Sequence, residues 1–514
     1  MAEPSRMSRI WKHIKEIFTT GEGHYINEHG ETVYGKLPRT KVENPIRTVC
    51  RPTAMNYLFF FVGWMAWTMD GYDFHTVSLS LSRLAVYYDQ HREHIATSIT
   101  LTLLFRSVGA AIFGIAGDLY GRKWPMIINL VIIAALQLAT AFCGTFSEFL
   151  GVRALFGIGM GGIWGLAASM GLENMPMEAR GLFSGILQQG YALGYLIAAV
   201  FNLYIVPGSP HSWKVLFYIG AGLTMAVAIA RVFFPESRQF IEAKANREGP
   251  QGKQKVKLFL ADGKKIMREY WKRALYAIVM MALFNCMSHT SQDMYPTYMQ
   301  QTKGFSPEMS SKATIIGKTG ALVGGTICGY YSQFLGRRFT IMIATFAGAC
   351  LIPLWVLPND WRLLTLGAFL IQFMVQGAWG VVPIHLQELA PPQFRSSFPG
   401  IAYQLGNMIA APAAQVASAI SEKLIIYIHG EERPDYGSTQ AAMMSVIFVL
   451  LFIWIACGTE QRGSHFELAA AAGEDQGQSD KLRAAEEVEM AEKAGGAGHV
   501  ETVSDLDDAG RTKI

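Results

Sequence analysis

Charge is scarce in this sequence. Asp, Glu, Lys and Arg together make up 16% of its 514 residues, against roughly 25% in ordinary soluble domains. Hydrophobic residues contribute 51%, and the mean hydropathy is +0.22. This balance argues against a water-soluble protein, and a net charge of +4 gives no reason to expect a nucleic-acid partner.

Signals of several other protein classes are missing. Only six cysteines occur, most of them inside apolar stretches, so we expect no disulfide framework. The first 50 residues lack the apolar core of a cleaved signal peptide, so the first apolar segment should be retained. No phosphate-binding loop, metal-ligand spacing or nucleophile elbow is found. We therefore expect neither an enzyme nor a bound cofactor or metal ion.

Long apolar stretches, by contrast, are plentiful. Runs of about 20 apolar residues are long enough to cross the hydrocarbon core of a bilayer, and such runs cross it as helices. The sequence therefore predicts an all-α membrane protein with twelve transmembrane helices in the lipid bilayer. Their approximate ranges are 56–80, 96–117, 124–145, 147–170, 181–206, 213–235, 272–298, 311–335, 338–357, 361–388, 394–421 and 438–457.

The distribution of positive charge predicts the orientation. The stretch 236–273 carries eleven Lys or Arg and five acidic residues, whereas the connections "VPGSPHS" and "CGTFS" carry no Lys or Arg. By the positive-inside rule the central loop is cytoplasmic, and an even number of spans then places both termini there. The tail is acidic and low in complexity, so we expect it to be disordered. The expected parts are an N-terminal segment (1–55), a first six-helix half (56–235), the central loop (236–271), a second six-helix half (272–460) and the tail (461–514).

The two halves of the chain repeat each other. Shifted by 215 residues without a gap, "GIAGDLYGRK" (114–123) aligns with "GYYSQFLGRR" (329–338). Apolar composition alone would not match Trp, Pro, Glu and Arg at one offset, so we expect two parallel six-helix repeats. Further identical pairs are Trp164 with Trp379, Glu173 with Glu388, Pro176 with Pro391, Arg180 with Arg395 and Gln189 with Gln404.

The loop "GDLYGRK" between spans 2 and 3 resembles the signature of the major facilitator superfamily. The resemblance implies a cytoplasmic charge network of Asp118, Arg122, Glu173 and Arg180, which would latch helix ends together in one state and release them in the other. In the second half Gln333 stands in the place of the acid. "RALFGIGMGG" (153–162) and "PESR" (235–238) resemble the sugar-porter branch.

Span 7 ends in a polar stretch, "NCMSHTSQDMYPT" (285–297). Asn285, His289 and Asp293 are spaced i, i+4 and i+8, so they lie on one helix face. Counted from Arg273, Asn285 lies about 18 Å and His289 about 24 Å into the membrane. Polar groups facing lipid would lack partners, so the stripe should face a water-filled cavity between the halves. The alternatives are that these groups join helices or cap the extracellular end, above all for Asp293.

The same stretch carries a second resemblance. The pattern Asn-x-x-Ser-His-x-Ser-Gln-Asp-x-x-x-Thr resembles the span-7 signature of the fungal Jen-type lactate and pyruvate permeases. Every signature position is filled between Asn285 and Thr297. The resemblance implies a carboxylate–proton symporter of the plasma membrane.

Arg106 is a charged residue within span 2. It lies 12 residues before Asp118, which places it about 18 Å deep, level with Asn285. A guanidinium at this depth costs at least about 2.5–3.5 kcal/mol on insertion scales, and it offers a two-pronged donor to a carboxylate. We expect it to anchor the substrate. The alternative is a structural partner for an acid on another helix.

Amide side chains lie in spans 5 and 11. Gln404 and Asn407 are spaced i, i+3, and Gln189, the repeat mate of Gln404, follows Gln188. These amides could bind a second carboxylate oxygen or a hydroxyl or keto group of the substrate. Each alone could equally join helices, but as a set on two spans they favour a site.

Proton coupling requires a group that can change charge inside the membrane. Asp70 in span 1 lies about 21 Å deep, and Arg153 enters span 4 from the other side to a similar depth. Proton-coupled sugar porters pair such an acid with this arginine, so we expect an Asp70–Arg153 pair; a purely structural salt bridge is the alternative. His289 is the rival proton carrier, because imidazole titrates near neutral pH.

The sequence therefore favours proton-coupled uptake of a short carboxylate by a monomeric transport unit. A facilitator of sugars or polyols would not need the arginine in span 2. A nutrient sensor that does not transport would be expected to carry long cytoplasmic segments. The preferred acid, the proton stoichiometry and the oligomeric state stay open.

Overall fold

The structure is a computed structural model, and it describes residues 22–26, 32–36, 43–236, 253–391, 394–428 and 431–458. The expected tail (461–514), the first part of the expected central loop (237–252) and residues 1–21 lie outside the described residues.

The first half of the bundle follows the short helix α2 (Pro45–Cys50). Thr53 begins α3 with a capping box that includes Asn56, and Thr145 begins α6 in the same way with Glu148. α6 and α7 form one crossing with a break at Gly162, where a Cβ would collide with Phe113 of α4. The helices are α3 (Ala54–Tyr88), α4 (Arg92–Tyr120), α5 (Lys123–Thr140), α6 (Phe146–Gly161), α7 (Ile163–Glu173), α8 (Arg180–Tyr204) and α9 (Lys214–Phe233).

The second half begins with a long helix, α11 (Lys253–Gln292), which ends inside the polar stretch. The chain continues through two short turns, α12 (Tyr295–Thr297) and η1 (Tyr298–Thr302). α16 and α17 form one crossing with a break at Ala411 and Pro412, because proline cannot donate a helical hydrogen bond. The remaining helices are α13 (Pro307–Leu335), α14 (Arg337–Val356), α15 (Trp361–Leu389), α16 (Ser397–Ala410), α17 (Ala413–Ser421) and α18 (Tyr436–Ala456).

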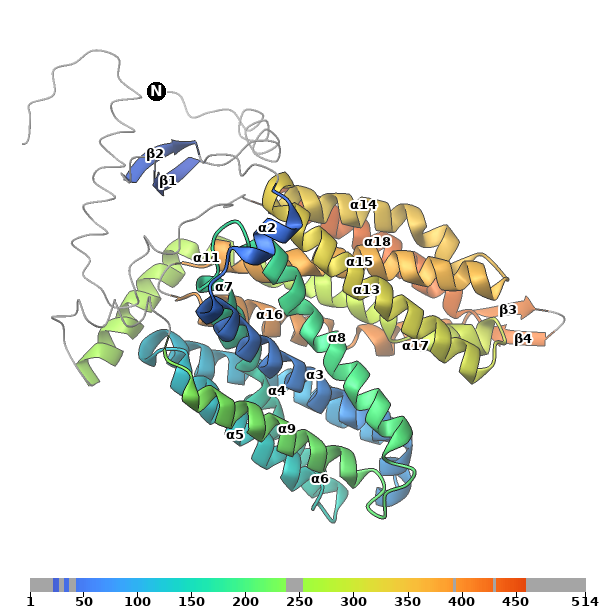
Figure 1. Ribbon diagram of the computed structural model, residues 1–514. Helices are drawn as coiled ribbons and strands as arrows, with labels where there is room; N and C mark the ends of the chain where they lie inside the picture. The colour runs from blue at the N-terminus through green and yellow to red at the C-terminus, as the bar shows by residue number, and fades with distance from the viewer. Residues whose placement is uncertain are drawn as a thin grey trace, which may run out of the picture.

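Two small antiparallel hairpins accompany the helices. β1 (Glu22–Ile26) pairs with β2 (Thr32–Lys36), and β3 (Ile425–Ile428) pairs with β4 (Glu431–Pro434). The second hairpin lies between α17 and α18, at the right-hand end of the bundle in Figure 1. Neither hairpin was expected from hydropathy, because both lie outside the long apolar stretches.

The expectation of twelve helical crossings in an all-α membrane protein is confirmed. Nine helices in the described ranges are long and apolar enough to cross a membrane. The other three crossings are α3 and α13, which carry more polar residues, and the interrupted pair α16–α17. Residues 253–271 of the expected central loop are helical and form the first part of α11, whereas the membrane-length segment begins at Tyr270. Lysine, leucine, methionine and glutamate favour helix even where charge keeps the segment out of lipid.

The repeat seen in the sequence is also a repeat of structure. α4 begins at residue 92 and ends at 120, and adding the offset of 215 gives 307 and 335, which are the bounds of α13. In Figure 1 the first half lies below, in blue to green, and the second half lies above, in yellow to red, apart from the light-green α11. The chain therefore forms two six-helix halves side by side.

We call one end of the bundle the inner end: it carries the tight turns at Gly121, between α4 and α5, and at Gly336, between α13 and α14. These glycines have φ of 93° and 104°, a region that residues with a Cβ rarely adopt. The opposite end, with the β3–β4 hairpin, is the outer end. The inner end is the one expected to face the cytoplasm.

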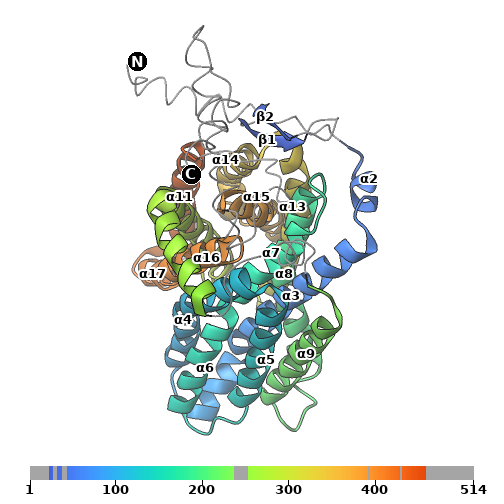
Figure 2. The same cartoon turned by 90° about the vertical axis from the view of Figure 1, so that its left-hand side faces the viewer.

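The halves meet chiefly where α4 packs against α16 and where α8 packs against α13 and α15. Figure 2 views the bundle from its inner end. Glycines permit the close approach near the inner end. A Cβ on Gly114 of α4 would lie 2.7 Å from Ser397 Cα of α16, and a Cβ on Gly185 of α8 would collide with the Gly325 carbonyl of α13. Ser184 adds a hydrogen bond of 2.8 Å to the Gly380 carbonyl. The bundle is therefore closed at its inner end.

We predict that Gly114→Val abolishes transport while the protein is still made and inserted. The valine side chain would force α4 and α16 apart, because the atoms it meets are backbone atoms that cannot rotate away. Solute uptake by cells and the amount of protein in the membrane are the two measurements.

Gly151→Val is the matched control, because a Cβ at Gly151 meets no atom within 4 Å. It should transport like the wild type. Wild-type transport by Gly114→Val would show that this close contact is not needed for the transport cycle.

Candidate functional site

A buried ion pair occupies the centre of the first half. Arg106 Nη2 lies 2.5 Å from Asp70 Oδ2, and the two side chains are 1% and 0% exposed. Arg106 comes from α4 and Asp70 from α3. Phe74 lies under the guanidinium at 5.2 Å, and Met160 Sδ lies 3.5 Å from Nη2. The pair is therefore shielded from water by apolar groups.

The ion pair does not use all its hydrogen-bonding capacity. Arg106 Nε and Asp70 Oδ1 are buried and have no hydrogen-bond partner among the described residues. A guanidinium has five N–H donors in a planar fork, and a carboxylate can accept on both oxygens. A carboxylate ligand could therefore take Arg106 as a partner if Asp70 released it.

The expected pair of Asp70 with Arg153 is wrong for this conformation, since Asp70 pairs with Arg106. Arg153 Nη1 instead donates to Gln137 Oε1 at 3.2 Å. The acid whose charge acts on Arg153 is Asp73.

Helix geometry explains this exchange of partners. Asp70 and Asp73 are three residues apart, so their side chains point about 60° apart around α3. Asp70 faces α4, whereas Asp73 faces α9 and accepts a hydrogen bond of 2.8 Å from Thr224 Oγ1. Asp73 was not among the predicted residues, and depth alone could not distinguish it from Asp70.

Aromatic side chains from both halves meet around Tyr403 of α16. Its ring stacks on Trp164 at 4.7 Å and contacts Trp379 at 5.9 Å and Trp67 at 6.2 Å. Trp164 also donates from Nε1 to Gln188 Oε1 at 3.3 Å. Tyr403 thus packs the second half onto Trp164 and Trp67 of the first, and single-sequence reasoning gave no signal for it.

The amides of α16 lie close to Arg106. Ser107, the next residue of α4, donates from Oγ to the Gln404 carbonyl at 3.3 Å. Asn407 Nδ2 lies 3.5 Å from Gln404 Oε1, and both residues are buried. Gln404 Nε2 has no hydrogen-bond partner in the described part of the chain. The structure therefore brings Gln404, Asn407 and Arg106 to the same level of the α4–α16 contact.

Gln189 faces a different helix pair. It is 5% exposed, and neither atom of its amide has a hydrogen-bond partner among the residues the structure describes. Its side chain lies against Gly325 of α13. Gln189 is thus available to a ligand, but from the α8–α13 side of the interface.

The residues of the expected stripe lie along α11 and just beyond its end at Gln292. His289 Nδ1 lies 2.8 Å from Asp293 Oδ2. Asn285 donates to the Met281 carbonyl of its own helix at 2.8 Å. The side chains of Asp293 and His289 are 43% and 23% exposed, whereas Asn285 is 4% exposed. The stripe therefore leads from the partly open outer side into the closed centre.

The predicted charge network lies at the inner end. Asp118 accepts hydrogen bonds from the backbone N–H groups of Ser396 and Ser397, each at 2.9 Å, and from Ser397 Oγ at 2.6 Å. Arg122 bonds Glu173 at 3.0 Å and lies 3.9 Å from Asp118. Asp118 of the first half thus holds the N-terminus of α16, where backbone N–H groups favour a negative charge.

Arg180 and residues of the second half form further polar contacts at the inner end. Arg180 donates from Nε to the Met175 carbonyl at 3.0 Å. Arg337 bonds both oxygens of Glu388, at 3.1 and 3.0 Å, and Gln333 Oε1 at 2.8 Å. Gln333 therefore joins an equivalent network in the second half, but without the negative charge of Asp118.

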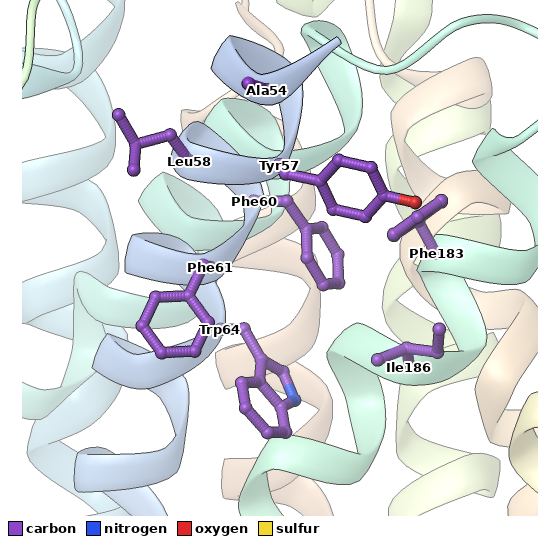
Figure 3. Close-up of a pocket in the computed structure, with 8 residues that line it drawn as sticks. All are labelled: Ala54, Tyr57, Leu58, Phe60, Phe61, Trp64, Phe183 and Ile186. Carbon is purple, nitrogen blue, oxygen red and sulfur yellow. The ribbon is translucent and has the colours of Figure 1, made fainter. Parts of the chain in front are cut away.

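A wide apolar groove between α3 and α8 is not part of this site. It has a volume of about 630 Å³, and its lining residues are apolar or aromatic. Figure 3 shows Tyr57, Phe60 and Phe183 close together there, with Trp64 below them. Because no charged group lines it, the groove does not suit a carboxylate.

Comparison with known proteins identifies the fold family. A family described as "Sugar (and other) transporter" matches residues 45–468. The chain belongs to this family of the major facilitator superfamily. It is a membrane transporter and not an enzyme.

Relatives and solved structures agree with this assignment. The chain is 32% identical to a "Carboxylic acid transporter protein homolog" of Saccharomyces cerevisiae, over 81% of this chain and 70% of that protein. It is 22% identical to the "Cis,cis-muconate transport protein" of Acinetobacter baylyi, over 69% and 85% of the two chains. The proton:xylose symporter XylE has the same fold, with a TM-score of 0.67 at 17% identity, over 82% of this chain and 99% of that one. Both resemblances, to the superfamily and to its fungal carboxylate permeases, are thus confirmed.

We predict that Arg106→Lys loses most transport while the protein still reaches the membrane. Lysine keeps the positive charge but lacks the planar fork that can bind Asp70 and a second carboxylate. Initial uptake rate, normalised to the amount of protein in the membrane, is the measurement. A wild-type rate with lysine at this position would remove Arg106 from the binding role.

His289→Ala is expected to weaken transport or to change its pH dependence. The substitution removes the hydrogen-bond partner of Asp293. It also removes an imidazole, which ordinarily changes charge near neutral pH. The measurement is the uptake rate across a series of external pH values. His94→Ala, an exposed histidine on α4, is the control, and identical profiles for the two variants would make His289 structural.

Proposed function

We propose that this transporter couples the uptake of short-chain carboxylates, such as lactate and pyruvate, to protons by alternating access. It would act as a monomeric unit in the plasma membrane, with both termini in the cytoplasm. The observation that carries the proposal is the buried Arg106–Asp70 pair. A transporter of neutral solutes has no evident need for a guanidinium at this place.

The coupling follows from the charges of this pair. With Asp70 ionised, the pair is neutral and Arg106 is occupied. If Asp70 takes up a proton, Arg106 loses its counter-charge, and a substrate carboxylate can replace it. The loaded site, with protonated Asp70, Arg106 and one carboxylate, is neutral again. One proton and one carboxylate therefore enter together without net charge.

The neighbouring polar groups would complete the site. Gln404, Asn407 and Gln189 have unused or weakly used amide groups close to the contact between the halves. Asn285, His289 and Gln188 lie next to them on α11 and α8, and could orient the hydroxyl or keto oxygen of the acid. Asp293 would share a proton with His289, and Arg153 would act together with Asp73.

Alternating access would require the inner end to open. In this conformation Asp118 binds the N-terminus of α16, and glycine contacts close the halves. Release of the substrate to the cytoplasm would break the Asp118 bonds and separate α4 from α16. Arg122, Glu173 and Arg180 would then hold the ends of the first half in place.

The names of two relatives support an acidic substrate, because one is a carboxylic acid transporter homolog and another carries cis,cis-muconate. The second candidate is a sugar or polyol transporter, which is favoured by the family description and by the likeness to a xylose symporter. A neutral substrate would leave Arg106 without a role in recognition. A competition assay distinguishes the two candidates. Uptake of labelled lactate is measured with an excess of unlabelled lactate or of unlabelled xylose, and only the true substrate should compete.

The proposed coupling predicts electroneutral uptake. Purified protein in lipid vesicles should accumulate labelled lactate when the outside is more acidic. An imposed potential at zero pH difference should give no accumulation, although it is worth about 2.3 kcal/mol per charge per 100 mV. Accumulation that follows the potential would mean that more than one proton accompanies each monoanion, and the pair-exchange mechanism would be abandoned.

Asp70→Asn separates coupling from binding in the same vesicles. Asparagine resembles the protonated acid in shape and charge, so Arg106 stays free for the substrate. We expect this variant to exchange lactate across the membrane but not to accumulate it against a gradient. Normal proton-driven accumulation by Asp70→Asn would place the proton on another residue.

A further inference from the structure

Lys318 of α13 is a charged residue that the proposed mechanism does not use. Its Nζ donates to Gln292 Oε1 of α11 and lies 5.8 Å from the ring centroid of Tyr195. Tyr195 belongs to α8 in the other half, so Lys318 reaches across the interface. Among the described residues no carboxylate oxygen lies within 4.0 Å of it. A largely shielded ammonium with an amide and an aromatic ring as neighbours has capacity left for an anion.

The repeat relates Lys318 to Arg106. Arg106 plus 215 is 321, so Lys318 lies three residues before the position equivalent to Arg106. α4 and α13 both run from the outer to the inner end, so Lys318 lies about 4.5 Å farther out than that position. The equivalent helices α4 and α13 thus carry Arg106 and Lys318 at the interface, and the two cations lie at different depths in the membrane.

Aromatic residues connect the two cations. The ring of Tyr195 lies 4.8 Å from that of His75, and His75 lies 5.1 Å from Tyr191. Tyr191 in turn lies 6.2 Å from Phe74, the ring over which Arg106 lies at 5.2 Å. A ligand that leaves Lys318 would therefore pass His75 and Tyr191 on its way to Arg106.

The surroundings become more open toward Lys318. Arg106 is 1% exposed, whereas Lys318, His75, Tyr195 and Gln292 are all partly exposed. Behind Lys318 and Gln292 lies a cavity of about 20 Å³, which is room for roughly one water molecule. Lys318 thus stands where the closed centre meets the partly open outer side.

We propose that Lys318, with Gln292, Tyr195 and His75, forms an outer subsite that binds the carboxylate of the substrate before it reaches Arg106. The inference rests on the proposed carboxylate transport. A bond from the ammonium to a carboxylate joins two ionised groups, and it adds a charge attraction that the bond to the neutral amide of Gln292 lacks. Two cations on one path also raise the local concentration of an anionic substrate.

Asp293 is the internal competitor for this subsite. Its charge acts on Lys318, and its side chain is bonded to His289. A bond between Asp293 and His289 keeps the carboxylate of Asp293 away from Lys318 and leaves the lysine to the substrate. The rival interpretation is that Lys318 only neutralises Asp293.

The test is lactate uptake by purified protein in vesicles, with KM and kcat determined separately. Lys318→Gln should raise KM for lactate about tenfold or more while kcat stays within about threefold, because a binding step before Arg106 is weakened. Lys318→Arg, which keeps the charge, should restore KM to near the wild-type value. Lys312→Gln is the matched control on the same helix, since Lys312 is exposed and forms an ion pair with the exposed Glu308, and its KM should not change.

Two results would overturn the proposal. One is a wild-type KM in Lys318→Gln. The other is recovery of the wild-type KM in the double variant Lys318→Gln with Asp293→Asn, which would mean that the lysine only neutralises Asp293. If Lys318→Gln does not assemble, Lys318→Met, which keeps the aliphatic stem, takes its place.

Failure of the function itself is a distinct result. If the wild type shows no proton-driven uptake of lactate, the proposed function is lost, whatever Lys318 does. If the wild type takes up lactate, Arg106→Lys does not and Lys318→Gln has an unchanged KM, the function stands and only the outer subsite is lost.

Discussion

A guanidinium and a carboxylate with almost no exposure face each other at the centre of the first half of the bundle. Removing one partner from such a pair costs about 3–5 kcal/mol, because the other charge is left buried and alone. Arg106 therefore needs a negative partner in every stable state of the protein. Asp70 supplies it in this conformation, and in the proposed cycle a substrate carboxylate would supply it when Asp70 is neutral. The need for a partner would thus link the substrate to the proton without a separate coupling device.

The two halves surround this pair asymmetrically, although they are built on one repeat. The first half contributes the ion pair and the charged latch Asp118, whereas the second half has Asn285 and Gln333 at the equivalent positions, 215 residues after Asp70 and Asp118. Asp118 accepts three hydrogen bonds from the start of α16. Gln333 bonds Arg337 inside its own half. The latch between the halves is therefore held more strongly on the α4–α16 side than on the α8–α13 side.

Close contact between helix backbones holds the inner end of the bundle shut. Glycines let α4 approach α16 and α8 approach α13 at the inner end, where Gly114, Gly185 and Gly325 meet the opposite helix. Helices that touch through backbone atoms have few intermediate positions, so the inner end is either closed or separated. Farther out, Tyr403 packs against three tryptophans, so the contacts there are between side-chain rings. The outer part of the interface can thus change its packing while the inner end stays shut.

The sequence by itself determined the architecture. Twelve crossings, two repeated halves and the polar stripe on α11 follow from hydropathy, a constant offset and helical spacing, because lipid permits little besides helices. It also identified Arg106, Asp118 and His289 as charged or titratable groups at particular depths, since depth depends only on counting residues along a helix.

Only the tertiary structure decided which groups meet. Asp70 and Asp73 have similar depths in the membrane. Because of the rotation of α3 against α4 and α9, Asp70 pairs with Arg106, whereas Asp73 interacts with the charge of Arg153. Lys318 lies inside the expected span 311–335, but its position at the interface became visible only through its contact with Tyr195 of the other half. The sequence did not predict that α11 begins as early as Lys253. The charged residues there indicate contact with water, but they do not determine the backbone conformation. The depth of a residue in the membrane follows from its place along one helix. Which side chain it contacts depends on how two helices are rotated against each other, and that rotation is set by packing across the whole bundle.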